Sequence, residues 1–134
     1  MEPRAGPGTT MSFSEAEPGF FIVRYDTPEA MSPGQQQPLL DALQQRSSQR
    51  LKVGIVFLVG PGVTSVRVEV PAFWLRVTRE LRLSAMAIVS RAATVQVAAL
   101  GFRLANKARG VVLPVETFEE EGPAVAWARG YLGG

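Results

Sequence analysis

Hydrophobic and polar positions divide the chain into short strands and amphipathic helices around one unusually apolar stretch. Residues 51–62 read LKVGIVFLVGPG, and every position from Val53 to Val59 is either apolar or glycine. A strand with one face in water alternates between apolar and polar residues, whereas this stretch does not. A short continuous apolar run that ends in a Gly-Pro-Gly turn predicts a strand covered by helices on both faces.

The pattern before this strand predicts a hairpin and a helix. Residues 20–26, FFIVRYD, favour a strand, and a Pro-Gly turn joins them to a weaker edge strand at residues 11–17. Leucines then recur with helical spacing, and because Pro38 is unfavourable inside a helix, the regular helix is expected over about residues 37–48. Gln35 to Gln37 are expected to lie on its solvated side.

The pattern after the central strand predicts further alternation of helices and strands. Residues 63–70 read as a short edge strand or as an extended approach to a helix that starts at Pro71. Gly101 is expected to let the third helix approach the sheet closely. The remaining expected elements are a buried strand at 84–90, a helix at 91–108, a strand at 110–115 and a last helix opened by Glu119, Glu120 and Glu121.

This order predicts one α/β domain. Helices that connect short buried strands imply a mainly parallel sheet, here of about five strands with four helices and an antiparallel N-terminal edge. Residues 1–10 are rich in Pro, Gly and Thr and are expected to be a disordered tail, so the domain spans residues 11–134. Met11 is an alternative start of the chain.

Composition restricts the chemistry available to the protein. The 134 residues include no His and no Cys, which excludes disulfides, thiolate metal sites, Cys nucleophiles and Ser-His-Asp triads. No catalytic residue, metal ligand or cofactor is predicted, and the protein is expected not to be an enzyme. The net charge of +2 gives no basic footprint for nucleic acid. No apolar run reaches the roughly 18 residues of a membrane span, so a cytoplasmic location is expected.

Several local patterns together resemble a known family. The segments that carry the resemblance are FIVRYD, MSPGQQQPLLDAL, KVGIVFLVG, SAMAIVS, GFRLANKARG and VETFEEEGPAVAWARGYL. Their order over roughly residues 11–132 is similar to the STAS superfamily of sulfate transporter and anti-sigma-factor antagonist domains, and within it to the SpoIIAA-like branch of small bacterial proteins. The resemblance implies a non-catalytic regulatory module that docks onto a protein partner, such as a kinase or an anti-sigma-like regulator.

The resemblance also suggests a control point. Anti-sigma-factor antagonists carry an Asp-Ser-Ser-Gly-like motif after the central strand, and its serine is phosphorylated. Here the sequence is GPGVTS, so Thr64 and Ser65 are the candidate phosphoacceptors, although neither is framed by Asp and Gly. The alternative, which the residues themselves favour, is that both are ordinary loop hydroxyls that form local turns. The residues expected to contact the partner, in this loop and in the helix after it, are Gly60, Gly62, Arg67, Arg76 and Arg79.

A second hypothesis assigns a ligand to the aromatic side chains. Some SpoIIAA-like domains are grouped with lipid-binding SEC14-type folds, which makes a carrier or sensor of a small apolar or lipid-like ligand the alternative function. The residues that would line its pocket are Phe73, Trp74, Phe102 and Trp127. Ordinary core packing explains the same residues. An exposed sheet edge would also permit a weak homodimer.

Overall fold

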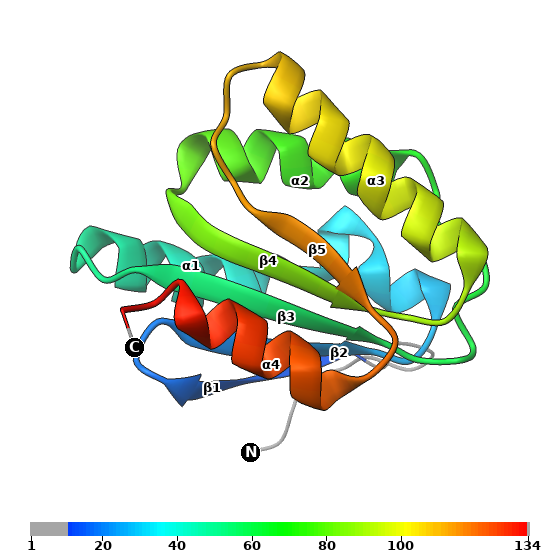
Figure 1. The fold of residues 1–134 in the computed structure, drawn as a ribbon, viewed down its shortest axis with the longest axis horizontal. Helices are drawn as coiled ribbons and strands as arrows, with labels where there is room; N and C mark the ends of the chain where they lie inside the picture. Colours follow the sequence, from blue (N-terminus) through cyan, green and yellow to red (C-terminus); the bar gives the residue numbers. More distant parts are fainter. Residues whose placement is uncertain (1–10, 134) are drawn as a thin grey trace.

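The computed structural model describes residues 11–133 and shows a five-stranded sheet with helices on both faces (Figure 1). The strands lie in the sheet in the same order as in the chain, β1-β2-β3-β4-β5. β1 is antiparallel to β2, and the other neighbouring pairs are parallel. The predicted α/β class, the four helices and the antiparallel N-terminal edge are therefore confirmed. The predicted tail at residues 1–10 lies outside the described residues.

The elements follow one another in a regular alternation after the first hairpin. The strands are β1 (Met11–Glu17), β2 (Phe20–Tyr25), β3 (Val53–Val59), β4 (Leu83–Val89) and β5 (Val115–Phe118). The helices are α1 (Gln37–Ser48), α2 (Glu69–Glu80), α3 (Ala93–Ala108) and α4 (Glu121–Gly130), with short 3-10 turns η1 (Pro28–Met31) and η2 (Pro33–Gln35) before α1.

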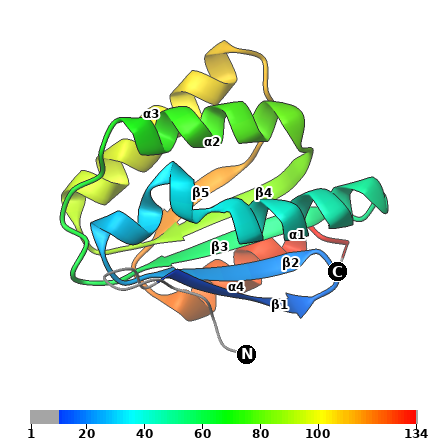
Figure 2. The ribbon, with the colours of Figure 1, turned by 180° about the vertical axis from the view of Figure 1, so that it is seen from behind.

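The helices are divided unequally between the two faces of the sheet. Figures 1 and 2 show α1, α2 and α3 on one face and α4 alone on the other. The larger hydrophobic cluster joins β1 to β5 with the first three helices, and the smaller cluster joins the opposite face of the sheet to α4. We call these the three-helix face and the α4 face.

The central strand explains why the chain needs both layers. β3 pairs in parallel with β2 on one side and with β4 on the other, and its residues from Val53 to Leu58 are all buried. Ile55 and Phe57 belong to the larger cluster, whereas Val56 and Leu58 belong to the smaller one. The continuous apolar run thus supplies side chains to two separate cores, as the sequence predicted.

Two expected elements are placed differently in the structure. Residues 63–68 form no strand but an irregular approach to α2, which starts at Glu69 instead of the expected Pro71. The last strand is β5 at Val115–Phe118 instead of residues 110–115. Val111 to Pro114 run outside the ladder, and Val112 is 91% exposed, because the chain must first cross from the end of α3 back to the sheet.

The structure also reverses two expectations about single side chains. Gln36, expected on a solvated side, is completely buried at 0% exposure. Gly101, expected to face the sheet, lies on the exposed side of α3, and a Cβ atom built on it meets nothing within 4 Å. Helical spacing alone does not settle such cases, since the direction of each face depends on how the helix is docked.

Candidate functional site

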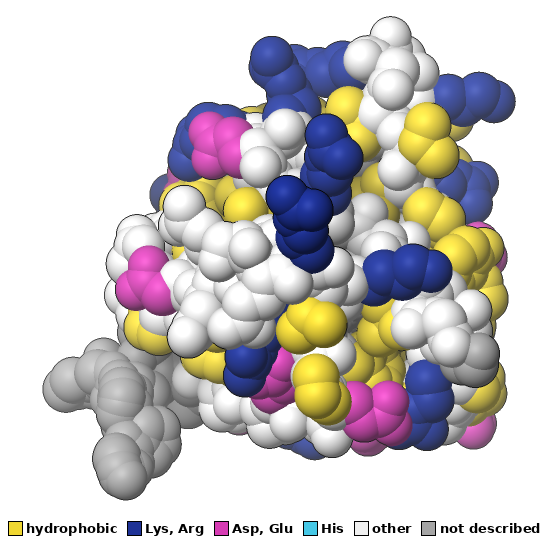
Figure 3. Space-filling model, turned by 90° about the vertical axis from the view of Figure 1, so that its left-hand side faces the viewer, with side chains coloured by type: hydrophobic (Ala, Val, Ile, Leu, Met, Phe, Trp, Pro, Cys, Tyr) yellow, Lys and Arg dark blue, Asp and Glu magenta, His cyan; other side chains and the backbone are white. Residues whose placement is uncertain are grey.

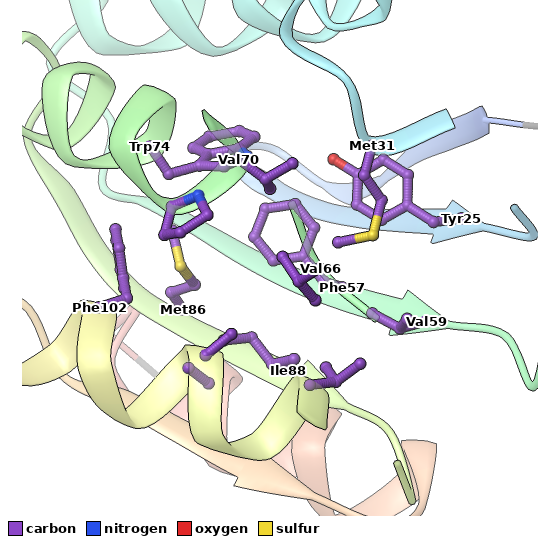
Figure 4. A pocket seen from close by; sticks show the side chains of 14 residues that line it. Tyr25, Met31, Phe57, Val59, Val66, Val70, Trp74, Met86, Ile88 and Phe102 are labelled. Atoms are coloured by element: carbon purple, nitrogen blue, oxygen red, sulfur yellow. The ribbon is translucent and has the colours of Figure 1, made fainter. Parts of the chain in front are cut away.

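An apolar pocket lies between the sheet and the helices of the three-helix face (Figure 4). Its volume is ≈ 70 Å³. Side chains from β2, β3 and β4 line it on the sheet side, and residues 66–71, α2 and α3 supply its other walls. The lining residues are Tyr25, Met31, Phe57, Val59, Val66, Val70, Pro71, Trp74, Met86, Ile88, Val95, Ala98, Ala99 and Phe102.

Aromatic rings hold one side of this pocket. The Tyr25 and Phe57 rings are stacked, with centroids 5.6 Å apart and planes at 15°. Phe57 in turn meets Trp74 nearly edge-on, at 5.1 Å and 69°. Such arrangements match the quadrupoles of the rings and add to the stabilisation from burial. The pocket wall is consequently rigid at this end, and its surface is hydrocarbon.

The Tyr25 hydroxyl beside the pocket has a hydrogen-bond partner within the protein. The Tyr25 hydroxyl donates a 2.6 Å hydrogen bond to Gln36 Oε1, and the Gln36 amide donates to the Ala30 carbonyl at 2.7 Å. Burial raises the pKa of the Tyr25 phenol far above its usual range, so it stays neutral. Tyr25 therefore acts as a structural donor that fixes the turn before α1, and it leaves no free polar atom for a ligand.

Of the four predicted pocket residues, two line the pocket. Trp74 and Phe102 are among its walls. Phe73 is buried and meets Trp74 edge-on at 5.4 Å, but it packs behind the pocket. Trp127 lies on the α4 face, between Phe118 and Tyr131 at 5.6 and 5.0 Å. The sequence could not separate these positions because periodicity does not say which face of the sheet a helix covers.

The loop after β3 is shaped by close contact with the end of β2. The Gly60 amide donates to the Tyr25 carbonyl at 2.7 Å. A Cβ atom at Gly60 would lie 3.1 Å from that oxygen, and one at Gly62 would lie 2.9 Å from the Asp26 carbonyl oxygen. Both predicted contact residues thus have a structural reason to be glycine. Val63, buried at 1% exposure, then anchors the loop to the core.

The residues after this anchor face solvent at the carboxyl end of the parallel strands. Thr64 and Ser65 are exposed, as are Arg67 and Val68, and Val68 reaches 84% exposure. The Thr94 hydroxyl donates a hydrogen bond to the Thr64 carbonyl, which ties the loop to the start of α3. The Arg67 guanidinium lies 3.7 Å from the Glu69 carboxylate. The loop is therefore held by its backbone while its side chains remain available.

The other predicted contact residues are spread along α2. The Arg76 guanidinium lies over the Phe73 ring, 5.3 Å from its centroid. Arg79 is one turn further on, near the end of α2. A helix rises about 1.5 Å per residue, so Arg79 lies about 15 Å along the axis from the first turn of α2. Arg79 therefore does not form one site with Arg67 and the loop hydroxyls.

Arg79 belongs to a second groove, at the end of the molecule where α2 and α3 end. This groove has a volume of ≈ 470 Å³ and is lined by Thr78, Arg79, Arg82, Leu83, Val111, Val112 and Leu113. The same end carries Lys107 and Arg109, where α3 ends. Figure 3 shows Lys and Arg side chains gathered over the upper part of this face. Cations at the ends of helices stabilise the helix dipole, which accounts for part of this pattern.

The described residues carry little that resembles an active site. Among residues 11–133, no group of three or more carboxylates is placed to hold a metal ion. Glu119, Glu120 and Glu121 lie at the start of α4, where acidic side chains are favourable, and Glu120 is 3.5 Å from Arg91. No helix in this part of the chain is long and apolar enough to cross a bilayer.

Comparison with known proteins gives no match. No family model matches the chain, and neither a curated protein nor a solved structure is significantly similar to it.

Proposed function

We propose that the protein is a non-catalytic regulatory module that docks onto a protein partner. The proposed docking surface, which we call the loop surface, consists of residues 60–70 and the first turn of α2. One observation carries this proposal. Within residues 66–71, Arg67 and Val68 are exposed to solvent, whereas Val66, Val70 and Pro71 line the edge of an apolar pocket. A partner that covers the exposed residues is thereby brought to the mouth of the pocket.

The pocket suits an anchoring side chain better than a whole lipid. Its ≈ 70 Å³ is about half the volume of an engineered apolar cavity that holds benzene, roughly 150 Å³. A few aliphatic carbons fit this space, as in a Val, Leu or Met side chain, whereas an acyl chain of ordinary length does not. A buried apolar anchor ringed by exposed contacts is typical of the energetic centre of a protein interface.

The resemblance to the SpoIIAA-like branch supports the same surface by analogy. In that branch the loop after the central strand is the control point, and here it is residues 60–65. The Asp-Ser-Ser-Gly-like frame is missing, so the module is proposed to be of the anti-sigma-factor-antagonist type without the usual phosphoserine switch. A phosphate on Thr64 or Ser65 would add up to two negative charges close to Arg67 and would change the preference of a partner.

A photo-crosslinking amino acid tests the docking surface in cells that produce the protein. Placed at Val68, it is expected to capture one defined protein. The same residue placed at Gln44, exposed on α1, is the matched control and is expected to capture none. Ala98→Leu fills the pocket from α3 and is expected to lower the yield at Val68 at least about tenfold. Equal capture at both positions, or none at Val68, contradicts the proposal.

The phosphorylation switch is tested separately. Once a partner is identified, its affinity is compared for the unmodified chain, for Thr64→Ala with Ser65→Ala, and for Thr64→Glu. A switch predicts that only the acidic variant weakens or strengthens binding, by at least about fivefold. Unchanged affinity in all variants removes the switch and leaves the docking module.

The carrier hypothesis remains the second candidate because the pocket is lined by hydrocarbon. If the protein carries a small apolar ligand, benzene or a short-chain fatty acid raises the melting temperature of the wild-type chain. Ala98→Leu is expected to abolish this rise by occupying the same space. A melting temperature that no such probe changes excludes the carrier and leaves the docking proposal intact.

A further inference from the structure

The outer face of α3 carries apolar side chains that nothing in the described chain covers. Val97, Leu100 and Leu104 are 68%, 45% and 55% exposed, and they recur at the spacing of one helix face. Exposed small residues continue the same face at both ends and in the middle. We call this row the α3 stripe; it consists of Ala93, Val97, Leu100, Gly101, Leu104 and Ala108.

Gly101 is the least expected member of the α3 stripe. Glycine inside a helix costs about 1 kcal/mol relative to alanine. Most such glycines allow a close contact within the fold, but a Cβ atom at Gly101 would have no neighbour within 4 Å. The chain therefore gains no packing from this glycine. A gap on an exposed apolar helix face is useful only to something that approaches from outside.

The α3 stripe is symmetric about the bond between Leu100 and Gly101. Counting outwards from this bond, Val97 corresponds to Leu104, and Ala93 corresponds to Ala108. In two antiparallel copies of α3 centred here, Val97 of one copy lies opposite Leu104 of the other, and Ala93 lies opposite Ala108. Leu100 of each copy lies opposite Gly101 of the other. Such a self-complementary face is what a two-fold symmetric interface requires.

Charge favours the same antiparallel arrangement. Near the start of α3, Glu120 lies 3.5 Å from Arg91, with Glu119 and Glu121 beside it in the chain. At the other end of α3, Lys107 and Arg109 have no salt bridge among the described residues. Antiparallel copies bring this basic end to the acidic end of the other molecule. Parallel copies would place like charges together.

From the symmetry of the stripe, the unexplained glycine and the opposite charges at its ends, we infer that the protein forms a homodimer through antiparallel packing of α3. One 16-residue helix per copy gives a contact about 24 Å long. Interfaces below about 1,200 Å² belong to weak or transient complexes, so the dimer is expected in the micromolar range or weaker. This surface is separate from the loop surface and does not depend on the proposed function.

Sedimentation analysis of the full chain, from low micromolar concentration to about 1 mM, tests self-association. The wild-type chain is expected to change from monomer to dimer across this range. Gly101→Leu fills the gap but improves helix propensity, so it is expected to keep or raise the melting temperature while weakening dimerisation at least about tenfold. Val112→Asp, at another exposed valine, is the matched control and is expected to change nothing.

Cysteine crosslinking tests the orientation. The chain has no cysteine, so an introduced thiol is the only one present. In the antiparallel dimer, position 97 of one copy lies opposite position 104 of the other. A mixture of Val97→Cys and Leu104→Cys chains is therefore expected to form a mixed disulfide. Each variant alone is not, because identical positions lie about 10 Å apart along the axis, beyond the roughly 7 Å limit for a disulfide.

Three results would overturn the inference. The first is a wild-type chain that stays monomeric at every concentration, even if a different protein binds α3. The second is dimerisation that Gly101→Leu leaves unchanged. The third is efficient crosslinking of either single variant alone, which would indicate a parallel pair.

Discussion

The three-helix face and the α4 face share one sheet but are packed with different side chains. On the three-helix face, aromatic rings such as Tyr25, Phe57 and Trp74 meet at several angles and leave a pocket of ≈ 70 Å³. On the α4 face, small residues bring the layers together: Ala124 and Ala128 are completely buried. The pocket lies where rings from several elements meet.

The two faces of the sheet also differ in their buried polar side chains. The three-helix face contains the buried Tyr25–Gln36 hydrogen bond and the buried Thr78–Asn106 contact at 3.2 Å. Three of the four buried polar side chains of the described residues, Gln36, Thr78 and Asn106, take part in these two contacts. Buried hydrogen bonds fix the relative positions of elements, whereas an alanine contact only limits their distance. The face with the pocket is thus the one whose geometry is specified more tightly.

Removing an aromatic ring is expected to have the largest effect on the free energy of unfolding. The size of this effect is expected to differ between the two faces. Phe57→Ala deletes a ring that is 5% exposed and contacts both Tyr25 and Trp74, so it is expected to cost about 3–5 kcal/mol. Phe118→Ala on the α4 face removes a partly exposed ring and is expected to cost less than half as much. Urea unfolding of both variants measures the difference; equal losses would contradict the comparison.

The buried hydrogen bond gives the next largest expected effect. Tyr25→Phe keeps the ring but leaves Gln36 Oε1 buried without its donor. The free energy of unfolding is expected to fall by about 1–3 kcal/mol. Because Tyr25 stays neutral, no change is expected in the pH dependence of stability around neutrality. Tyr131→Phe, at a partly exposed hydroxyl on the other face, is the control; an equal loss there would mean that burial is not the cause.

Adding carbon atoms to a buried site is expected to destabilise the α4 face more than the three-helix face. Ala128→Leu on the α4 face adds carbon atoms to a site with no room and is expected to destabilise the protein by about 1–3 kcal/mol. Ala98→Leu adds the same atoms at the pocket and is expected to cost less than about 1 kcal/mol. Thermal unfolding of the pair measures this. A larger loss of stability from Ala98→Leu than from Ala128→Leu would show that the pocket is not accessible from α3.

The smallest expected effect on stability comes from two ion pairs, one on each face of the sheet. Arg46 donates two hydrogen bonds to the Glu15 carboxylate, at 2.7 and 2.9 Å, and the Gly19 amide donates a third. The Arg46 hydrogen bonds hold the pKa of Glu15 below its usual value. A lowered pKa contributes stability above the unfolded value, near pH 4.3, and this stability is lost as pH falls through the folded value.

The test compares Glu15→Gln with Glu17→Gln, which breaks the more exposed pair between Glu17 and Arg129 on the α4 face. Glu15→Gln is expected to lower the melting temperature at pH 7 slightly and to flatten its decrease below about pH 4.3. Glu17→Gln is expected to have a smaller effect. Identical pH profiles for the wild type and Glu15→Gln would show that the Arg46 pair makes no net contribution.

Much of the fold could be predicted because strands, helices and turns each have a characteristic local residue pattern. The continuous run Val53–Val59 fixed the central strand, and α1 occupies the predicted residues 37–48. The Pro-Gly turn between the first two strands was also correct, and Gly19 there has a φ of 84° that glycine adopts without strain. The last strand was wrong by several residues, since Val111 and Val112 look like strand residues but lie outside the sheet.

The candidate site was predicted less well than the fold. Trp74 and Phe102 line the same pocket, whereas Trp127 lies on the α4 face. No local signal distinguishes Gln36, which is buried, from Gln35 and Gln37, which are exposed. A glutamine becomes buried only when partners such as Tyr25 and the Ala30 carbonyl arrive from other segments. Those contacts join residues 11 and 6 positions apart and do not follow a helix or strand period.

The sequence by itself determined the order of the elements, the parallel sheet and the absence of His and Cys chemistry. These properties depend on composition and on the period of apolar residues within one segment. The tertiary structure decided which face each helix covers. It placed Trp127 away from Trp74, turned Gly101 outwards, and separated Arg79 from the loop surface. Docking decides such matters because an amphipathic helix specifies that one side is covered, but not which neighbour covers it.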